Sequence, residues 1–77
     1  MKKTHETCYY DSSMIIKSDY IFAESRLIVE FKGGTQYSFN GVSIETYKSF
    51  SEAESIGKSF NEVIKPLGGT KITSDYE

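Results

Sequence analysis

The sequence has few of the residues from which reactive centres are built: one histidine, one cysteine, one proline and no tryptophan among 77 residues. A single cysteine, Cys8, excludes an internal disulfide and any metal site built from several cysteines. The only histidine, His5, lies in a polar segment, and no cluster of acidic, histidine or cysteine residues has metal-ligand spacing. We therefore predict that the protein is not an enzyme and uses no cofactor or metal.

Long apolar runs and excess positive charge are also missing. No stretch approaches the ~20 apolar residues that a membrane-spanning helix needs, and the basic start Met1-Lys2-Lys3 is followed by polar residues, unlike a signal peptide. Nine Lys and Arg face eleven Asp and Glu, for a net charge of −2. Because binding to long duplexes depends mainly on Lys and Arg, we expect no binding to long duplex DNA. Without an apolar run or a signal peptide, we expect a cytoplasmic protein of a bacterium or phage-infected cell that does not bind membranes.

Aromatic residues are the abundant apolar class, with six tyrosines and five phenylalanines. Each buried aromatic side chain removes about 150–250 Å² from water, so a few of them can form most of a small core. A single core is only marginally sufficient at this chain length. We therefore expect a homo-oligomer, in which an interface adds buried area.

The segment from Leu27 to Phe39 predicts a β-hairpin, because apolar and polar residues alternate on both sides of Gly33-Gly34. A two-residue loop would mix the two faces of the hairpin. A three-residue loop over 32–34 instead builds one apolar face, pairing Phe31 with Thr35, Val29 with Tyr37 and Leu27 with Phe39. We predict this second register, with a type I turn closed by Gly34 at positive φ.

The remaining pattern predicts an α+β domain: a three-stranded antiparallel meander packed by two short α-helices. The strands are expected over 14–22, 26–32 and 35–41, with 70–73 available as a fourth, short edge strand. Ser43 is the predicted N-cap of a helix over 44–53, and Ser55 caps a second helix that Pro66 stops. We expect residues 1–11 to form a flexible arm, 12–73 the single domain and 74–77 a tail.

Several short motifs in a fixed order resemble the KTSC domain family. They cover roughly residues 12–65 and comprise Ser12-Ser13-Met14-Ile15, Leu27-x-Val29-x-Phe31, Gly34, Tyr37-x-Phe39, Gly41-Val42, Tyr47 and Gly57-x-x-Phe60-Asn61. The family takes its name from the C-terminal extension of some lysyl-tRNA synthetases and also occurs as stand-alone short proteins. The resemblance implies RNA binding without assigned catalytic residues. Two departures are Phe39, which lacks the family's second tyrosine hydroxyl, and Ser43-Ile44 in place of paired prolines.

Candidate ligand contacts fall into two groups. The predicted start of the second helix brings free N–H groups, Gly57 and the Lys58 ammonium together, which suits an anion, and Asn61 can bond a base edge. The alternative is structural, with Ser55 as a plain cap, Gly57 allowing close packing and Asn61 capping a nearby loop. The polar face of the hairpin is either a recognition face or ordinary solvated surface. The candidate ligand-binding residues are Ser13, Lys17, Arg26, Gln36, Ser38, Gly57, Lys58 and Asn61.

These observations leave three functional hypotheses. The first is a non-enzymatic module that binds a nucleotide-type ligand, either a short RNA element or a small or cyclic oligonucleotide, and sequesters it as a phage antagonist of host defence. An acidic protein suits such a compact ligand better than a long polyanion. The second is a protein-interaction module that uses Tyr9-Tyr10 or a strand edge. The third is a tRNA-binding or RNA-binding appendage without catalysis.

Overall fold

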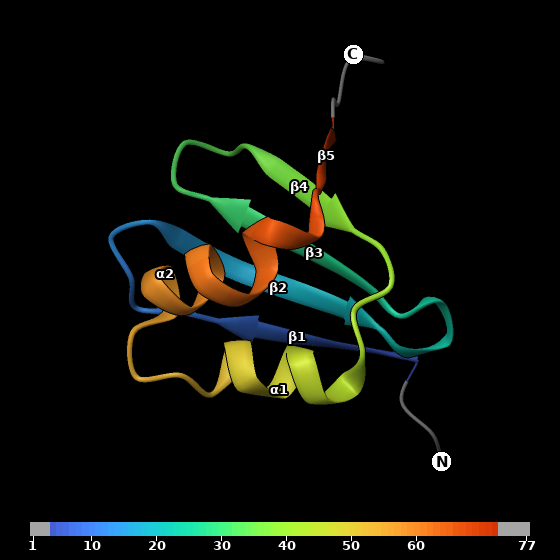
Figure 1. The fold of residues 1–77 in the computed structure, drawn as a ribbon. Coiled ribbons are helices and arrows are strands. Elements are labelled where there is room, and N and C mark those ends of the chain that lie inside the picture. Colours follow the sequence, from blue (N-terminus) through green and yellow to red (C-terminus); the bar gives the residue numbers. More distant parts are fainter. Residues whose placement is uncertain (1–3, 73–77) are drawn as a thin grey trace.

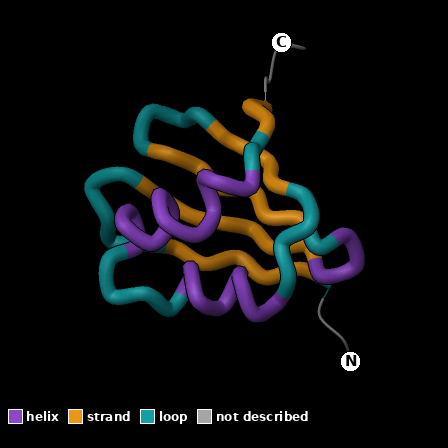
Figure 2. The backbone as a smooth tube through the Cα atoms, in the orientation of Figure 1, coloured by secondary structure: helices purple, strands orange, loops and turns teal. Residues whose placement is uncertain are grey.

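A computed structural model describes residues 4–72, which form a five-stranded antiparallel sheet with helices packed on one of its faces (Figures 1 and 2). The strands lie in chain order: β1 (His5–Tyr9), β2 (Ile15–Ile21), β3 (Arg26–Phe31), β4 (Gln36–Phe39) and β5 (Thr70–Ile72). Helix α1 spans Ile44–Ser51 and α2 spans Ile56–Ser59. A π-helical turn over Phe60–Ile64 and a 3-10 turn over Lys65–Leu67 continue α2.

The predicted α+β class and the predicted meander of β2, β3 and β4 are present, but the sheet is larger than the meander. The expected fourth edge strand is β5, which pairs with β4 over Thr70–Ile72. Residue 73 of that prediction and the predicted tail lie outside the described residues.

The additional strand is β1, so the prediction of a flexible arm is wrong for His5–Tyr9. These residues pair with β2 from His5↔Ile21 to Tyr9↔Lys17. Their side chains alternate between exposed and half-buried, and Cys8 Sγ lies 3.3 Å from Tyr47 Oη on the helix side of the sheet. Polar residues occupy both the inward-facing and the outward-facing positions of this segment. It therefore lacks the apolar alternation that identifies a strand. The first three residues of the predicted arm are not among those that the structure describes.

The hairpin register is the predicted one, with Val29 opposite Tyr37 and Leu27 opposite Phe39. The turn type differs from the prediction. Gly33 and Gly34 both have positive φ, at 100° and 95°, and Gly34 N–H donates to the Phe31 carbonyl at 3.0 Å. A positive φ at the third turn residue is the requirement of a type II turn, which Gly33 meets without steric cost.

The core lies between the sheet and the helices, and aromatic rings supply much of it, as predicted. Tyr20 of β2 stacks on Tyr47 of α1 with ring centroids 4.5 Å apart, and the Tyr20 hydroxyl donates to the Val42 carbonyl. The remaining buried apolar residues come from every layer: Ile15, Leu27, Val29, Phe39, Phe50, Ile56, Phe60 and Ile64.

Both predicted helix caps are confirmed. Ser43 Oγ accepts a hydrogen bond from Thr46 N–H at 3.1 Å, and Ser55 Oγ accepts one from Lys58 N–H at 3.4 Å. The second helix is less regular than predicted, because only its first four residues are α-helical. The chain then widens into the π-helical turn, which keeps Phe60 and Ile64 buried.

Two tyrosine hydroxyls between β1, β2 and α1 predict a loss of stability at alkaline pH. Burial raises the pKa of Tyr10 from 10.0 to about 12, and it also raises the pKa of Tyr47. The unfolded chain therefore loses these protons at lower pH than the folded protein does. We expect the contribution of these two groups to the free energy of unfolding to be constant below about pH 10 and to fall as pH rises further toward the folded-state pKa.

Urea denaturation between roughly pH 8 and pH 12 measures this effect. Tyr10→Phe should make the decline shallower. Tyr9→Phe is the matched control, because the Tyr9 side chain is 75 % exposed. An equally steep decline in Tyr10→Phe would contradict the assignment to Tyr10.

Candidate functional site

An apolar cavity lies between the β3–β4 hairpin, the π-helical turn and the loop before β5. Its volume is about 720 Å³, within the range of small-molecule sites. We call it the aromatic cavity, and it is lined by Met14, Phe31, Thr35, Tyr37, Phe39, Phe60, Asn61, Lys65, Gly68 and Gly69.

Four rings give the aromatic cavity a fixed wall. Phe60 meets Phe31 edge-to-face with centroids 5.1 Å apart, and it meets Phe39 in the same way at 5.6 Å. Phe31 and Tyr37 make a third such contact at 5.7 Å. Phe39 and Phe60 are almost fully buried, while Phe31 and Tyr37 are half-buried. The half-buried rings therefore leave flat apolar surface on which a planar group can pack.

Polar groups stand at the rim of this wall. The Asn61 amide and the Lys65 ammonium belong to exposed side chains of the helical stretch, and the Thr35 hydroxyl lies on the hairpin. Asn61 follows Phe60 in the π-helical turn, and both residues line this cavity.

A second cavity, of about 530 Å³, lies between the loop after β1 and the loop before α2. We call it the polar cavity, because carboxyl and hydroxyl side chains supply much of its lining: Asp11, Ser12, Ser13, Glu54 and Ser55. Ser12 Oγ accepts hydrogen bonds from the N–H groups of Met14 and Ile15, at 3.1 and 3.4 Å, and so fixes the first loop. Met14 lines both cavities.

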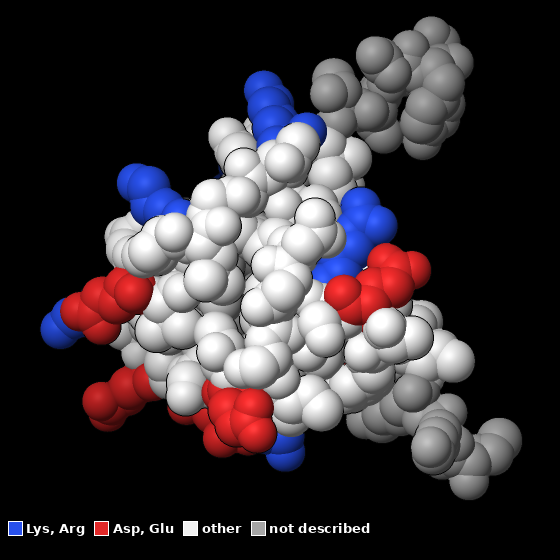
Figure 3. Space-filling view, turned by 45° about the vertical axis from the view of Figure 1, so that its right-hand side comes forward, with Lys and Arg blue, Asp and Glu red and all other residues white. Residues whose placement is uncertain are grey.

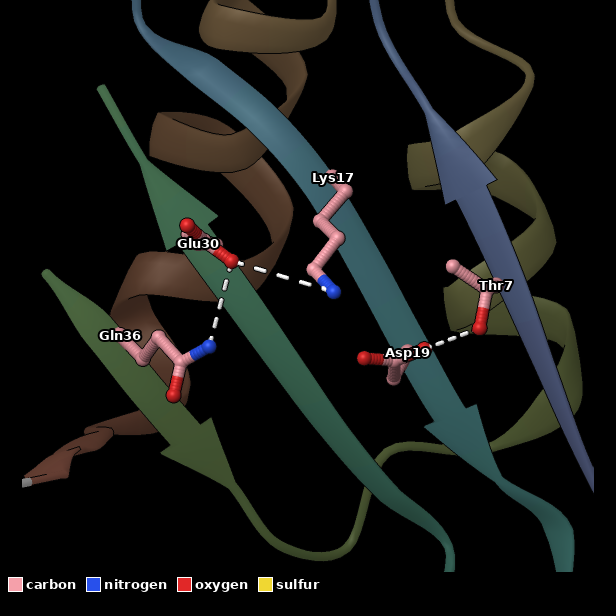
Figure 4. A network of polar contacts seen from close by, with 5 residues as sticks. All are labelled: Thr7, Lys17, Asp19, Glu30 and Gln36. Atoms are coloured by element: carbon pink, nitrogen blue, oxygen red, sulfur yellow. Dashed lines mark hydrogen bonds and ion pairs between the residues drawn. The ribbon is translucent and has the colours of Figure 1, made fainter. Parts of the chain in front are cut away.

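The structure does not bring the predicted ligand-binding residues together into one site. Ser13 and Gly57 line the polar cavity and Asn61 lines the aromatic cavity. The other hairpin and strand candidates lie on the sheet face opposite the helices, which Figure 4 shows in part: Lys17, Arg26, Gln36 and Ser38.

The candidates on the open sheet face already bond one another or their neighbours (Figure 4). Glu30 accepts from Gln36 Nε2 at 3.2 Å and lies 4.0 Å from Lys17 Nζ. Arg26 Nε donates to Ser38 Oγ at 2.7 Å. A ligand on this face would have to compete with these partners, so the geometry favours the structural alternative for this face.

The predicted anion site at the start of α2 has weak electrostatic support. The Ser55 cap already accepts the Lys58 N–H, and the carboxylates of Asp11 and Glu54 line the adjoining cavity. The structural alternative, in which Gly57 allows close packing, is not required by the geometry either. A Cβ atom added at Gly57 would lie 3.6 Å from Met14 Sδ, an ordinary contact. Lys58 is exposed.

Basic residues do not gather into a broad patch on the face in Figure 3, where Lys and Arg are separated by uncharged surface and by acidic residues. Within residues 4–72, no three His, Cys, Asp or Glu side chains are close enough together to hold a metal ion. No helix in the same part of the chain is long and apolar enough to cross a membrane.

Sequence reasoning favoured a core role over base stacking for Tyr37 and Phe39, and it did not foresee the cavity that both residues line. Phe39 is in the core, and it also forms part of a cavity wall. Sequence reasoning also missed Lys65. The four-residue spacing of Asn61 and Lys65 was the available signal, since residues at this spacing share one side of a helix.

Two comparisons with known proteins point to the KTSC domain family. The model of the KTSC domain matches residues 11–67. An uncharacterized protein of Stutzerimonas stutzeri strain A1501 is 36 % identical over 55 residues, which cover 71 % of this chain and 78 % of the relative. The crystal structure of a KTSC domain protein from Yersinia pestis superposes with a TM-score of 0.76 at 25 % identity, covering 91 % of this chain and 97 % of that one.

Proposed function

The chain belongs to the KTSC domain family, and from its cavity chemistry we propose that it is a small module that binds a nucleotide-type ligand without transforming it. The observation that carries this proposal is the aromatic cavity. Its wall of four rings is joined by a hydroxyl, an amide and an ammonium group at the rim.

The residues of this cavity can interact with the base and with the phosphate of a nucleotide. Stacking of a base on an aromatic side chain contributes about 1–3 kcal/mol, and Tyr37 and Phe31 offer partly exposed rings. The Asn61 amide both donates and accepts hydrogen bonds, as the edge of a base does. The Lys65 ammonium can pair with a phosphate.

The rim groups are suited to holding a ligand. An amide and a hydroxyl orient a bound molecule through hydrogen bonds, and neither takes up or releases a proton readily near neutral pH. A protein that binds a nucleotide and leaves it intact lowers its free concentration by mass action. We propose this sequestering role. It would act, for example, in an infected cell, where a phage protein removes a nucleotide signal of the host.

Charge reversal at the rim tests the proposal. Lys65→Glu should weaken binding of a mononucleotide by about tenfold, which corresponds to 1.4 kcal/mol, because it replaces a phosphate partner with a repelling carboxylate. Isothermal titration calorimetry with the four ribonucleoside monophosphates gives the affinities. Lys48→Glu on α1 is the matched control, since Lys48 is also exposed and does not line the cavity.

The same titrations separate the alternatives. Equal losses in the two lysine variants would indicate a general charge effect and contradict the rim assignment. No binding by the unaltered protein, together with no nucleotide-dependent rise in melting temperature, would favour the protein-interaction hypothesis. Native mass spectrometry of the purified protein adds the mass of any bound ligand and tests the predicted homo-oligomer.

A further inference from the structure

We infer that the ligand spans both cavities and consists of two nucleoside units joined through phosphate. This inference rests on the proposed function and names the ligand class more narrowly. Met14 lines both the aromatic cavity and the polar cavity, so the two hollows adjoin at this residue. Each has a volume within the usual range for a small-molecule site, at about 720 and 530 Å³. Each is therefore large enough to receive its own unit.

One helical stretch follows both cavities. Gly57 lines the polar cavity, while Asn61 and Lys65, four and eight residues further along, line the aromatic cavity. Lys58 is exposed and lies three residues before Asn61, so these two side chains share one side of the helix. A ligand that lies along this stretch would pass a Lys58 or Lys65 ammonium with its linking phosphate.

The lining of the polar cavity decides which part of the second unit enters it. Asp11 and Glu54 repel a phosphate, whereas carboxylates accept hydrogen bonds from the hydroxyls of a ribose. The hydroxyls of Ser13 and Ser55 add both donors and acceptors. The second nucleoside therefore enters the polar cavity with its sugar and base, and the linking phosphate remains outside near the lysines.

Gly57 is the position at which the polar cavity can be closed selectively. Its φ lies outside the left-handed region, and an added Cβ would make only an ordinary contact with Met14. A side chain at 57 therefore fits the backbone and would project where the second unit is expected to lie. Replacing glycine within a helix also raises helix propensity.

The experiment compares Gly57→Leu with Gly57→Ala by calorimetry, using adenosine monophosphate, the linear dinucleotide ApA and cyclic di-AMP. The unaltered protein should bind one or both dinucleotides roughly a hundredfold more tightly than the mononucleotide, because the second unit binds intramolecularly. Gly57→Leu should remove that advantage and leave the mononucleotide affinity unchanged. Gly57→Ala changes the backbone in the same way and should retain most of the advantage. Comparison of the linear and cyclic dinucleotides shows which phosphate linkage the two cavities accept.

The possible failures are distinguishable. Mononucleotide binding without any dinucleotide advantage would overturn this inference and leave the proposed function standing. A dinucleotide advantage that survives Gly57→Leu would also overturn it, because the second unit would lie elsewhere. Absence of binding by every nucleotide would overturn the proposed function and this inference together. Melting temperatures of the variants show that each one is folded.

Discussion

Phe60→Ala is expected to destabilise the protein by about 3–5 kcal/mol, the range for removing a large buried aromatic side chain. Phe60 is 5 % exposed and makes edge-to-face contacts with Phe31, Phe39 and Phe50. Domains of this size are stable by about 0.05–0.15 kcal/mol per residue. The loss is therefore a large part of the total free energy of unfolding. Urea denaturation monitored by circular dichroism should show a transition midpoint at a much lower urea concentration.

Phe60→Leu is the control for this variant. It retains an apolar side chain of similar reach, so its cost should stay close to 1.5 kcal/mol or below. If Phe60→Ala cost less than about 1 kcal/mol, the ring would not be part of the packed core. In that case the wall of the aromatic cavity would have to be redrawn.

Gly69→Ala is expected to destabilise the protein by about 1–3 kcal/mol and to abolish ligand binding in the aromatic cavity. A Cβ atom at this position would overlap the Phe39 ring, well inside van der Waals contact. Phe39 is 3 % exposed, and its ring packs edge-to-face against Phe60. The ring or the loop before β5 must shift, and both belong to the cavity wall. Chemical denaturation and nucleotide titration measure the two effects.

A double-mutant cycle isolates the contact between these two residues. Phe39→Leu shortens the side chain, so adding Gly69→Ala to it should cost less than Gly69→Ala costs in the unaltered protein. Residues in direct contact show coupling of this kind, about 0.5–3 kcal/mol. Additive costs would contradict the contact. Thr70→Ala, at an exposed neighbouring position, should change stability by about 0.5 kcal/mol or less.

The hairpin shows how far local sequence rules reach. A wrong loop length would have turned Val29 and Leu27 away from Tyr37 and Phe39. The requirement that these apolar side chains share one face alone selected the observed register. The turn type was outside the reach of the same rule. Two consecutive glycines allow several turn conformations, so the pattern of apolar residues does not distinguish among them.

The β1 strand and the π-helical turn show where local rules end. Glu6 and Cys8 are half-buried because α1 lies on that side of β1, a tertiary contact with no counterpart in the local pattern. The apolar spacing of Phe60 and Ile64 predicted a helix correctly. Its widening follows from packing those residues against the sheet, and the spacing alone does not determine it.

The candidate site was predictable only in part. Polar residues were selected one by one for their chemistry, and the fold placed four of them on the opposite face of the sheet from the cavities. The aromatic residues were recognised as core, but the cavity forms where these rings meet the helical stretch and the loop at Gly68-Gly69. That boundary depends on three segments distant in sequence, and local patterns do not contain it.

The order of the strands has a kinetic consequence. Each of β1, β2 and β3 pairs with the next strand along the chain through a short connection, whereas residues 40–69, with all of α1 and α2, separate β4 from β5. Closing a longer loop costs more entropy, so β5 should be the last strand to dock and the first to detach. The loop before β5 forms one side of the aromatic cavity, so its detachment would give a ligand a route in and out without unfolding the rest of the domain.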